Sequence, residues 1–305
     1  MKYLAATVQF EPEMFAKERN IDALVRLVEE AAASGARLII TPEMGLTGYC
    51  WYDREEVAPY VEQVPGPSTQ SFAALAAKLD CYIVIGLPEV DADNGLYYNT
   101  AVLVGPEGYL GKHRKSHPYI AEPKWAASGD TGHQVFETSL GRIALLICMD
   151  IHFLETARLV ALQGAEVICH LSNWLAERAP APYWISRAKE NGCYLIESNR
   201  WGVERGVQFS GGSCVIEPDG HIQASRDDGD GNPDGAFVSQ CFGSRFSVVF
   251  IRVSKKCSGL FIRRFTAHCS LLKECPEQAD QHEHEQHGEG EETVARHAPL
   301  VTQRP

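Results

Sequence analysis

The stretch GRIALLICMDIHFLETARLVALQ, residues 141–163, contains a strand pattern, a sharp turn and a helical pattern in succession. Residues 142–147 form a near-continuous apolar run, which is typical of a strand buried on both faces. Residues 152–163 then carry the apolar spacing of a helix. Cys148 therefore lies at a strand-to-helix elbow, where backbone N–H groups and a helix N-terminus favour a thiolate. It is a candidate nucleophile, and a buried core cysteine is the alternative.

The succession of an apolar strand and an amphipathic helix recurs on both sides of residues 141–163. Apolar strands between amphipathic helices predict an α/β domain whose sheet is covered on both faces. The turn sequence GPEG at residues 105–108 predicts a hairpin, so the sheet should be mixed. The other predicted strands cover residues 4–10, 37–41, 81–86, 99–104, 109–114, 167–171, 194–198 and 213–217, and the other helices cover 16–34, 68–79 and 181–191.

Composition narrows the class of protein. The 305 residues are 45% hydrophobic and 22% charged, which is ordinary for a globular chain. The formal net charge of −12 argues against a nucleic acid or an anionic membrane as partner. The apolar run in MKYLAATVQFEPE is too short for a secretory signal or a membrane span. We therefore expect a cytoplasmic protein with reduced thiols and without a membrane partner.

Two further predicted strands end in charged residues. Glu43 follows residues 37–41 in the segment TPEMGLTGY, and Lys115 follows residues 109–114 in GKHRKSHPY. Taken singly, each is more simply a solvated loop residue. Together with Cys148 they supply a base, a cation for a developing oxyanion and a nucleophile. We therefore expect the three side chains to converge at one end of the sheet.

On these motifs the sequence resembles the nitrilase, or carbon–nitrogen hydrolase, superfamily. The resemblance covers residues 3–225 and implies a four-layer α-β-β-α sandwich of two stacked mixed sheets. It also implies a homo-oligomer that associates across the helix at residues 152–163. The matching motifs are Thr41-Pro42-Glu43, Arg114-Lys115-Ser116-His117 and Cys148-Met149-Asp150, followed by Ser172-Asn173-Trp174.

The resemblance also implies a chemistry. Cys148 would attack a carbonyl while Glu43 acts as base and then as acid towards the leaving nitrogen. Lys115 and the backbone N–H of Met149 would form the oxyanion hole. Glu122 matches the additional glutamate of the family and would orient Lys115 and the attacking water. No metal or organic cofactor is implied.

The residues after the nucleophile favour one branch of the superfamily. Met149-Asp150 is similar to the amidases and carbamoylases, whereas true nitrilases usually carry Trp-Glu. We expect a small amide or N-carbamoyl compound to be cleaved to an acid and ammonia or an amine, through a thioester. A nitrile is the alternative substrate. The candidate substrate-binding residues are Tyr49, Trp51, Asn173 and Trp174, and for each aromatic residue plain packing is an equal alternative.

The C-terminal region departs from the family pattern. We assign residues 1–241 to the hydrolase domain, 242–275 to a divergent basic segment and 276–305 to a polar, disordered tail. The basic segment is rich in apolar residues, so it should pack on the domain or at a subunit interface, or else promote aggregation. It is either a natural extension or a translation in an altered reading frame. A catalytically impaired, family-like scaffold is therefore the second functional class.

Overall fold

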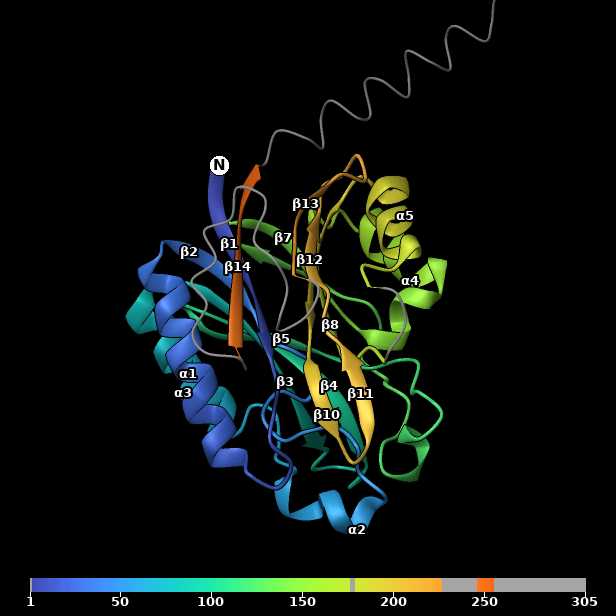
Figure 1. Cartoon of the computed structure of the whole chain (residues 1–305). Helices are drawn as coiled ribbons and strands as arrows, with labels where there is room; N and C mark the ends of the chain where they lie inside the picture. The colour runs from blue at the N-terminus through green and yellow to red at the C-terminus, as the bar shows by residue number, and fades with distance from the viewer. Residues whose placement is uncertain (1, 176–178, 227–245, 255–305) are drawn as a thin grey trace, which may run out of the picture. The chain divides into compact units, whose positions relative to one another are not determined.

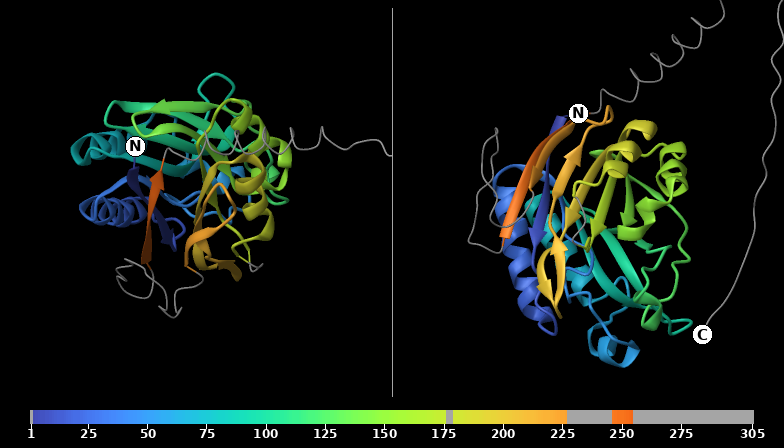
Figure 2. Two further views of the ribbon diagram at one scale, coloured as in Figure 1. Left: turned by 90° about the horizontal axis from the view of Figure 1, so that it is seen from above. Right: turned by 45° about the vertical axis from the view of Figure 1, so that its right-hand side comes forward.

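Two stacked sheets form the centre of the protein. The computed structural model describes residues 2–175, 179–226 and 246–254, and the structural statements below concern these residues. They form two six-stranded mixed sheets and a two-stranded hairpin. Helices α1 and α3 cover the outer face of one sheet, and α4 and α5 cover that of the other (Figures 1 and 2). The predicted α-β-β-α sandwich of two mixed sheets is confirmed.

The first sheet has the strand order β14-β1-β2-β3-β4-β5. Strands β1, β2 and β3 are parallel, whereas β3, β4 and β5 form an antiparallel meander, and β14 pairs antiparallel with β1. The elements are β1 (Lys2–Phe10), α1 (Lys17–Ala33), β2 (Ala36–Ile40), α2 (Arg54–Val57), η1 (Ala58–Tyr60), α3 (Pro67–Leu79), β3 (Tyr82–Val90), β4 (Tyr97–Gly105), β5 (Gly108–Arg114) and β14 (Phe246–Ser254).

The second sheet has the strand order β13-β12-β9-β8-β7-β6. Its centre, β7, β8 and β9, is parallel, and its outer strands are antiparallel. The elements are η2 (Glu122–Lys124), β6 (Val135–Thr138), β7 (Gly141–Ile147), η3 (Cys148–His152), α4 (Leu154–Leu162), β8 (Val167–Ser172), α5 (Pro182–Asn191), β9 (Tyr194–Asn199), β10 (Trp201–Glu204), β11 (Val207–Ser210), β12 (Ser213–Ile216) and β13 (Ile222–Arg226).

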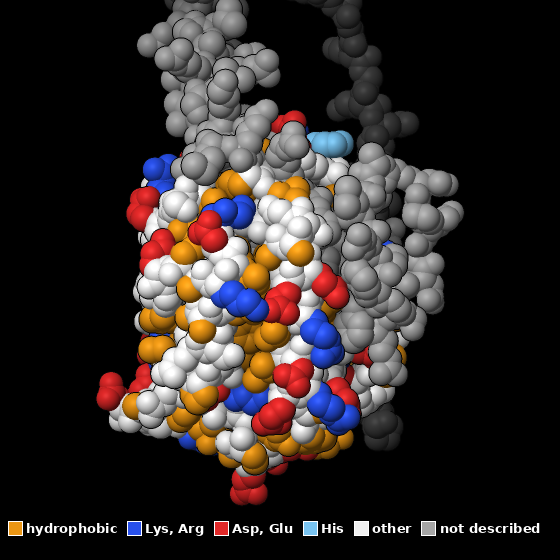
Figure 3. Space-filling view, turned by 90° about the vertical axis from the view of Figure 1, so that its left-hand side faces the viewer, with side chains coloured by type: hydrophobic (Ala, Val, Ile, Leu, Met, Phe, Trp, Pro, Cys, Tyr) orange, Lys and Arg blue, Asp and Glu red, His pale blue; other side chains and the backbone are white. Residues whose placement is uncertain are grey.

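The central strands are continuous apolar runs in the sequence because both of their faces are buried. In β2, Leu38 and Ile40 join the core between the two sheets, while Ile39 joins the separate core under α1 and α3. Successive side chains of a strand point to opposite faces, so each sheet contributes to two apolar layers. The outer face of α1 and α3 instead carries Lys, Arg, Asp and Glu side chains of both signs (Figure 3). Lys78 and Glu29 form a 3.0 Å ion pair between these two helices.

The sequence patterns located most of the longer elements and missed several short ones. Strands β6, β10, β11 and β13 contain at most two consecutive apolar residues, whereas the equally short β2 and β12, which were predicted, contain three. The helix expected at residues 152–163 begins only at Leu154, because the 3-10 turn η3 occupies the chain directly after β7. No described helix is both long and apolar enough to cross a membrane.

The C-terminal region is described only in part. Within the segment 242–275, residues Phe246–Ser254 form β14, which was not among the predicted strands. The rest of that segment and the tail at 276–305 lie outside the described residues. The division of this region into a packed segment and a disordered tail therefore stays a prediction.

Candidate active site

Three strands deliver the predicted catalytic residues. Glu43 follows β2 and Lys115 follows β5, both in the first sheet, while Cys148 follows β7 in the second. Glu122 begins the short turn η2. All four side chains are buried. Parallel strands of stacked sheets end at a common edge, so residues distant in sequence can meet there.

A hydrogen-bonded cluster joins Lys115 to both glutamates. The Lys115 ammonium Nζ donates to Glu43 Oε1 at 2.8 Å and to Glu122 Oε2 at 2.6 Å. The Asn99 amide Nδ2 donates to Glu43 Oε1 at 2.7 Å and to Glu122 Oε1 at 2.6 Å. Glu43 Oε2 is buried and has no hydrogen-bond partner among the described residues. One oxygen of Glu43 is thus held in place, while the other is free to accept a proton.

The charges within this cluster set the protonation states. Burial raises the pKa of Glu43, and the nearby Lys115 charge only partly offsets that effect. Burial alone would lower the pKa of Lys115, but the charges of Glu122 and Glu43 outweigh it and raise that pKa well above its usual value. Lys115 therefore stays cationic, and Glu43 has the raised proton affinity expected of a general base.

Cys148 occupies the sharp elbow expected from the sequence. Its backbone φ is +42°, a left-handed conformation that is uncommon for a residue other than glycine. Burial raises the pKa of the Cys148 thiol, as does the Glu43 charge, although Lys115 and a hydrogen bond from the Asn173 backbone act in the opposite direction. Burial thus outweighs the contributions that favour a thiolate, and the Cys148 thiol needs a base to become a nucleophile.

Asp150 ties the Lys115 loop to this elbow. Its Oδ1 accepts hydrogen bonds from the backbone N–H groups of Ser116, at 3.1 Å, and His117, at 3.0 Å, and contacts His117 Nδ1 at 2.9 Å. Its Oδ2 lies 2.8 Å from His113 Nε2 and accepts from the Ile147 N–H at 3.1 Å. Burial would raise the pKa of Asp150, but the hydrogen bonds from both histidines outweigh it and hold the pKa well below its usual range.

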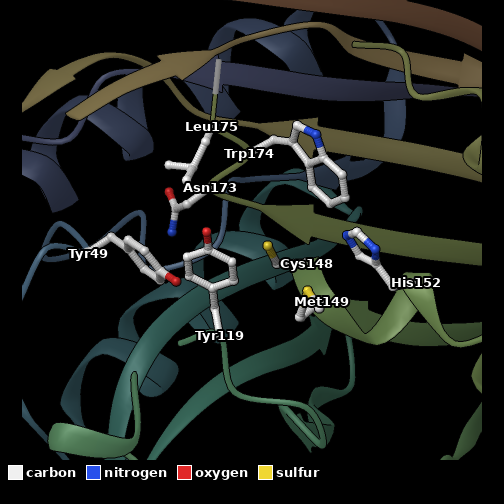
Figure 4. A pocket seen from close by; sticks show the side chains of 8 residues that line it. All are labelled: Tyr49, Tyr119, Cys148, Met149, His152, Asn173, Trp174 and Leu175. Atoms are coloured by element: carbon white, nitrogen blue, oxygen red, sulfur yellow. The ribbon is translucent and has the colours of Figure 1, made fainter. Parts of the chain in front are cut away.

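A small pocket opens onto the Cys148 side chain. Its volume is about 100 Å³, and its lining is mostly aromatic and apolar (Figure 4). Three of the four predicted substrate-binding residues, Tyr49, Asn173 and Trp174, line it. The complete lining is Tyr49, Tyr119, Cys148, Met149, His152, Asn173, Trp174 and Leu175.

Trp51 is not among the residues that line this pocket, so its role in substrate binding stays a prediction. Its indole Nε1 donates to the Gly48 carbonyl at 3.1 Å. Its ring packs against Tyr60, at a centroid distance of 5.1 Å, and against Phe15, at 5.5 Å. Trp51 thus stabilises the loop that follows Glu43, in a satellite aromatic core that also contains Trp125.

The sequence reasoning missed several residues of the site. Asn99 begins a predicted strand, and its position opposite Glu43 follows only from the stacking of the chain in three dimensions. Tyr119 lies two residues after the lysine motif, and Leu175 directly follows the Ser-Asn-Trp motif, so their proximity to those motifs was an available signal. Among the described residues, no group of His, Cys, Asp and Glu is arranged to hold a metal ion.

Comparison with known proteins agrees with this geometry. Residues 4–231 match the family described as Carbon-nitrogen hydrolase. A nitrilase from Pyrococcus abyssi is 38% identical over 218 residues, which cover 71% of this chain and 82% of the relative. The human omega-amidase NIT2 is 29% identical over 226 residues, covering 68% of this chain and 79% of the relative. The chain belongs to the carbon–nitrogen hydrolase family.

Solved structures share the fold. Saccharomyces cerevisiae Nit3, a member of branch 10 of the nitrilase superfamily, aligns with a TM-score of 0.73 at 22% identity, covering 86% of this chain and 94% of its own. An amidase from Nesterenkonia aligns with a TM-score of 0.67 at 22% identity, covering 88% of this chain and 97% of its own. The predicted class, an amidase-type carbon–nitrogen hydrolase, is confirmed.

Proposed function

We propose that this enzyme hydrolyses a small primary amide or N-carbamoyl compound through a thioester on Cys148. The observation that carries the proposal is the state of Glu43. Its Oε1 is fixed by Lys115 and Asn99, and its buried Oε2 has no partner among the described residues. A neutral thiol beside a free carboxylate oxygen of raised proton affinity is a nucleophile with its base.

The geometry supports a two-stage reaction. Glu43 takes the thiol proton as Cys148 Sγ bonds to the amide carbon, and the carbonyl electron pair moves onto oxygen. Lys115 Nζ and the Met149 N–H stabilise that oxyanion. The C–N bond then breaks as Glu43 gives its proton to the nitrogen, which leaves as ammonia or an amine. Glu43 next deprotonates a water molecule as that water attacks the thioester carbon. The C–S bond then breaks, the acid leaves, and Glu43 returns the proton to restore the Cys148 thiol.

The pocket limits the substrate. A pocket of about 100 Å³ favours a small acyl group. Its aromatic and apolar lining favours an uncharged acyl group. In a Glu-to-Gln mutant of the Nesterenkonia amidase, the acetamide moiety of fluoroacetamide is joined covalently to the active-site cysteine. A similarly small acyl group fits the pocket of the present enzyme.

A matched substrate panel tests this function. The panel compares ammonia release from acetamide and propionamide, from N-carbamoyl compounds of similar size and from the corresponding nitriles. Cys148→Ala serves as the blank. We expect an amide or carbamoyl compound to react faster than its nitrile. The alternative, a nitrile substrate, is motivated by the Pyrococcus relative named as a nitrilase. Faster release from a nitrile than from its amide would establish that alternative instead.

We also propose that two copies associate across α4. Four large apolar side chains on or beside this helix are exposed, and Leu162 is the most exposed, at 76%. Apolar surface of this kind is often buried between subunits. Leu162→Glu should shift the protein towards monomer in light scattering, with the exposed Val203→Glu as a matched control. An unchanged mass would contradict this interface. The four side chains are Phe153, Leu154, Leu159 and Leu162.

A further inference from the structure

A buried histidine–glutamate pair lies directly behind the nucleophile. His170 in β8 and Glu197 in β9 face each other in the register of these parallel strands, and both are fully buried. His170 Nδ1 contacts Glu197 Oε2, and His170 Nε2 lies 3.0 Å from the carbonyl oxygen of Cys148. The reaction described above assigns no role to either residue.

The hydrogen-bond partners fix the proton count of this pair. A carbonyl oxygen can only accept, so His170 Nε2 must carry a hydrogen and donate it to Cys148. A second proton lies between His170 Nδ1 and Glu197 Oε2. Whichever of these two atoms carries that proton, the net charge of the pair is zero. Burial lowers the pKa of His170, but the charge and hydrogen bond of Glu197 outweigh it and raise the pKa. The donor state therefore persists through neutral pH.

The carbonyl that His170 holds belongs to the same peptide unit as the expected oxyanion donor. The C=O of Cys148 and the N–H of Met149 share one planar trans peptide, so they point in opposite directions. The carbonyl is bound to His170 behind the elbow, whereas Met149 lines the pocket (Figure 4). Fixing the carbonyl therefore fixes the direction of the N–H.

We propose that the His170–Glu197 pair positions and polarises the Met149 N–H for its task in the oxyanion hole. This inference rests on the proposed acyl-transfer function. A hydrogen bond from a charged or strongly polarised donor to a peptide carbonyl makes the N–H of that peptide a stronger donor in turn. The hydrogen bond from His170 to the Cys148 carbonyl also opposes relaxation of the left-handed backbone at Cys148. His170 is thus a positioning residue that never touches the substrate.

Two substitutions of His170 test whether the hydrogen bond to the Cys148 carbonyl matters, rather than the imidazole ring itself. In His170→Gln the amide nitrogen can occupy the place of Nε2 and still donate to the Cys148 carbonyl. In His170→Asn the amide reaches only the place of Nδ1. We expect kcat/KM of His170→Asn to fall about 10- to 100-fold, mainly in kcat, because the loss of an oxyanion donor costs about 100- to 1,000-fold and misalignment costs less. His170→Gln should recover most of that loss.

A second readout excludes a merely structural effect. Alkylation of Cys148 by iodoacetamide proceeds at a saturated carbon and forms no oxyanion, so its rate should change less than about two-fold in all folded variants. Propionaldehyde, in contrast, adds to the thiol to form a thiohemiacetal whose oxygen occupies the oxyanion hole. Its affinity, measured as protection of Cys148 from iodoacetamide, should weaken in His170→Asn and recover in His170→Gln.

The aldehyde also separates this inference from the proposed function, since protection requires no amide turnover. A wild-type protein that binds propionaldehyde but hydrolyses no amide would contradict the function while leaving the oxyanion hole measurable. Glu197→Gln, whose amide can still hold the hydrogen on Nε2, provides a second variant and should lose less than His170→Asn. Equal aldehyde affinity in wild type, His170→Asn and Glu197→Gln would overturn the inference. Loss in His170→Asn with rescue in His170→Gln would support it.

Discussion

Asp150→Asn should damage both the stability and the catalysis of this enzyme. Five hydrogen bonds converge on the wild-type carboxylate, three at Oδ1 and two at Oδ2. An amide has one accepting oxygen, and its NH₂ group must face either the Ile147 N–H or the two backbone N–H groups at Oδ1. Either placement leaves buried donors unpaired.

The size of the effect follows from this geometry. The loss of one partner of a buried charged network costs about 3–5 kcal/mol, and we expect Asp150→Asn to fall in that range. Urea denaturation at pH 7 measures it. Asp130→Asn is the matched control, because its carboxylate is 55% exposed and pairs with Arg114 at 2.8 Å. Arg114 is buried but keeps its ion pairs with Glu89 and Asp91, so loss of the half-exposed Asp130 charge should cost only about 0–1 kcal/mol, as for a surface pair.

The stability that Asp150 contributes should depend on pH in a definite direction. The pKa of Asp150 is held well below its usual range in the folded protein, so its contribution is fully present above the unfolded value of about 3.9. That contribution is lost progressively as the pH falls towards the folded pKa. The stability difference between wild type and Asp150→Asn should therefore shrink as the pH falls below about 4. A variant within about 1 kcal/mol of wild type at pH 7, with unchanged kcat/KM, would refute the reasoning.

Further predictions concern the site and the chain end. Gly86→Ala should lower kcat/KM at least about 10-fold, because a Cβ there would lie 2.9 Å from Glu43 Cα and displace the base; wild-type activity would contradict this. Cys148→Ala and Glu43→Gln should abolish ammonia release in a coupled assay, whereas Cys169→Ala should not. The rate should rise with pH through an apparent pKa above 4.5, because burial raises the pKa of Glu43; a limb below that value would argue against Glu43 as base. Proteolytic removal of residues 276–305 should leave turnover intact, and loss of activity would overturn the predicted tail.

The sequence allowed the nucleophile, base and lysine to be proposed because each directly follows an apolar strand. Strand ends are visible in a pattern, and the edge of stacked sheets is where such ends meet. Asn99 and His170 were not proposed, because their roles depend on which strand packs opposite another. The packing of Trp51 could not be predicted for the same reason, because its partners Phe15 and Tyr60 come from other segments.

Strand β14 has a consequence for the behaviour of this protein during synthesis. β1 forms nine residue pairs with it, from Lys2 to Phe10. A nascent or truncated chain that lacks Phe246–Ser254 leaves the N–H and C=O groups on that side of β1 without their partner strand, and an open edge of this length recruits strands from other molecules. During synthesis, β14 is made more than two hundred residues after β1. The protection of β1 from pairing with other molecules therefore depends on synthesis of Phe246–Ser254.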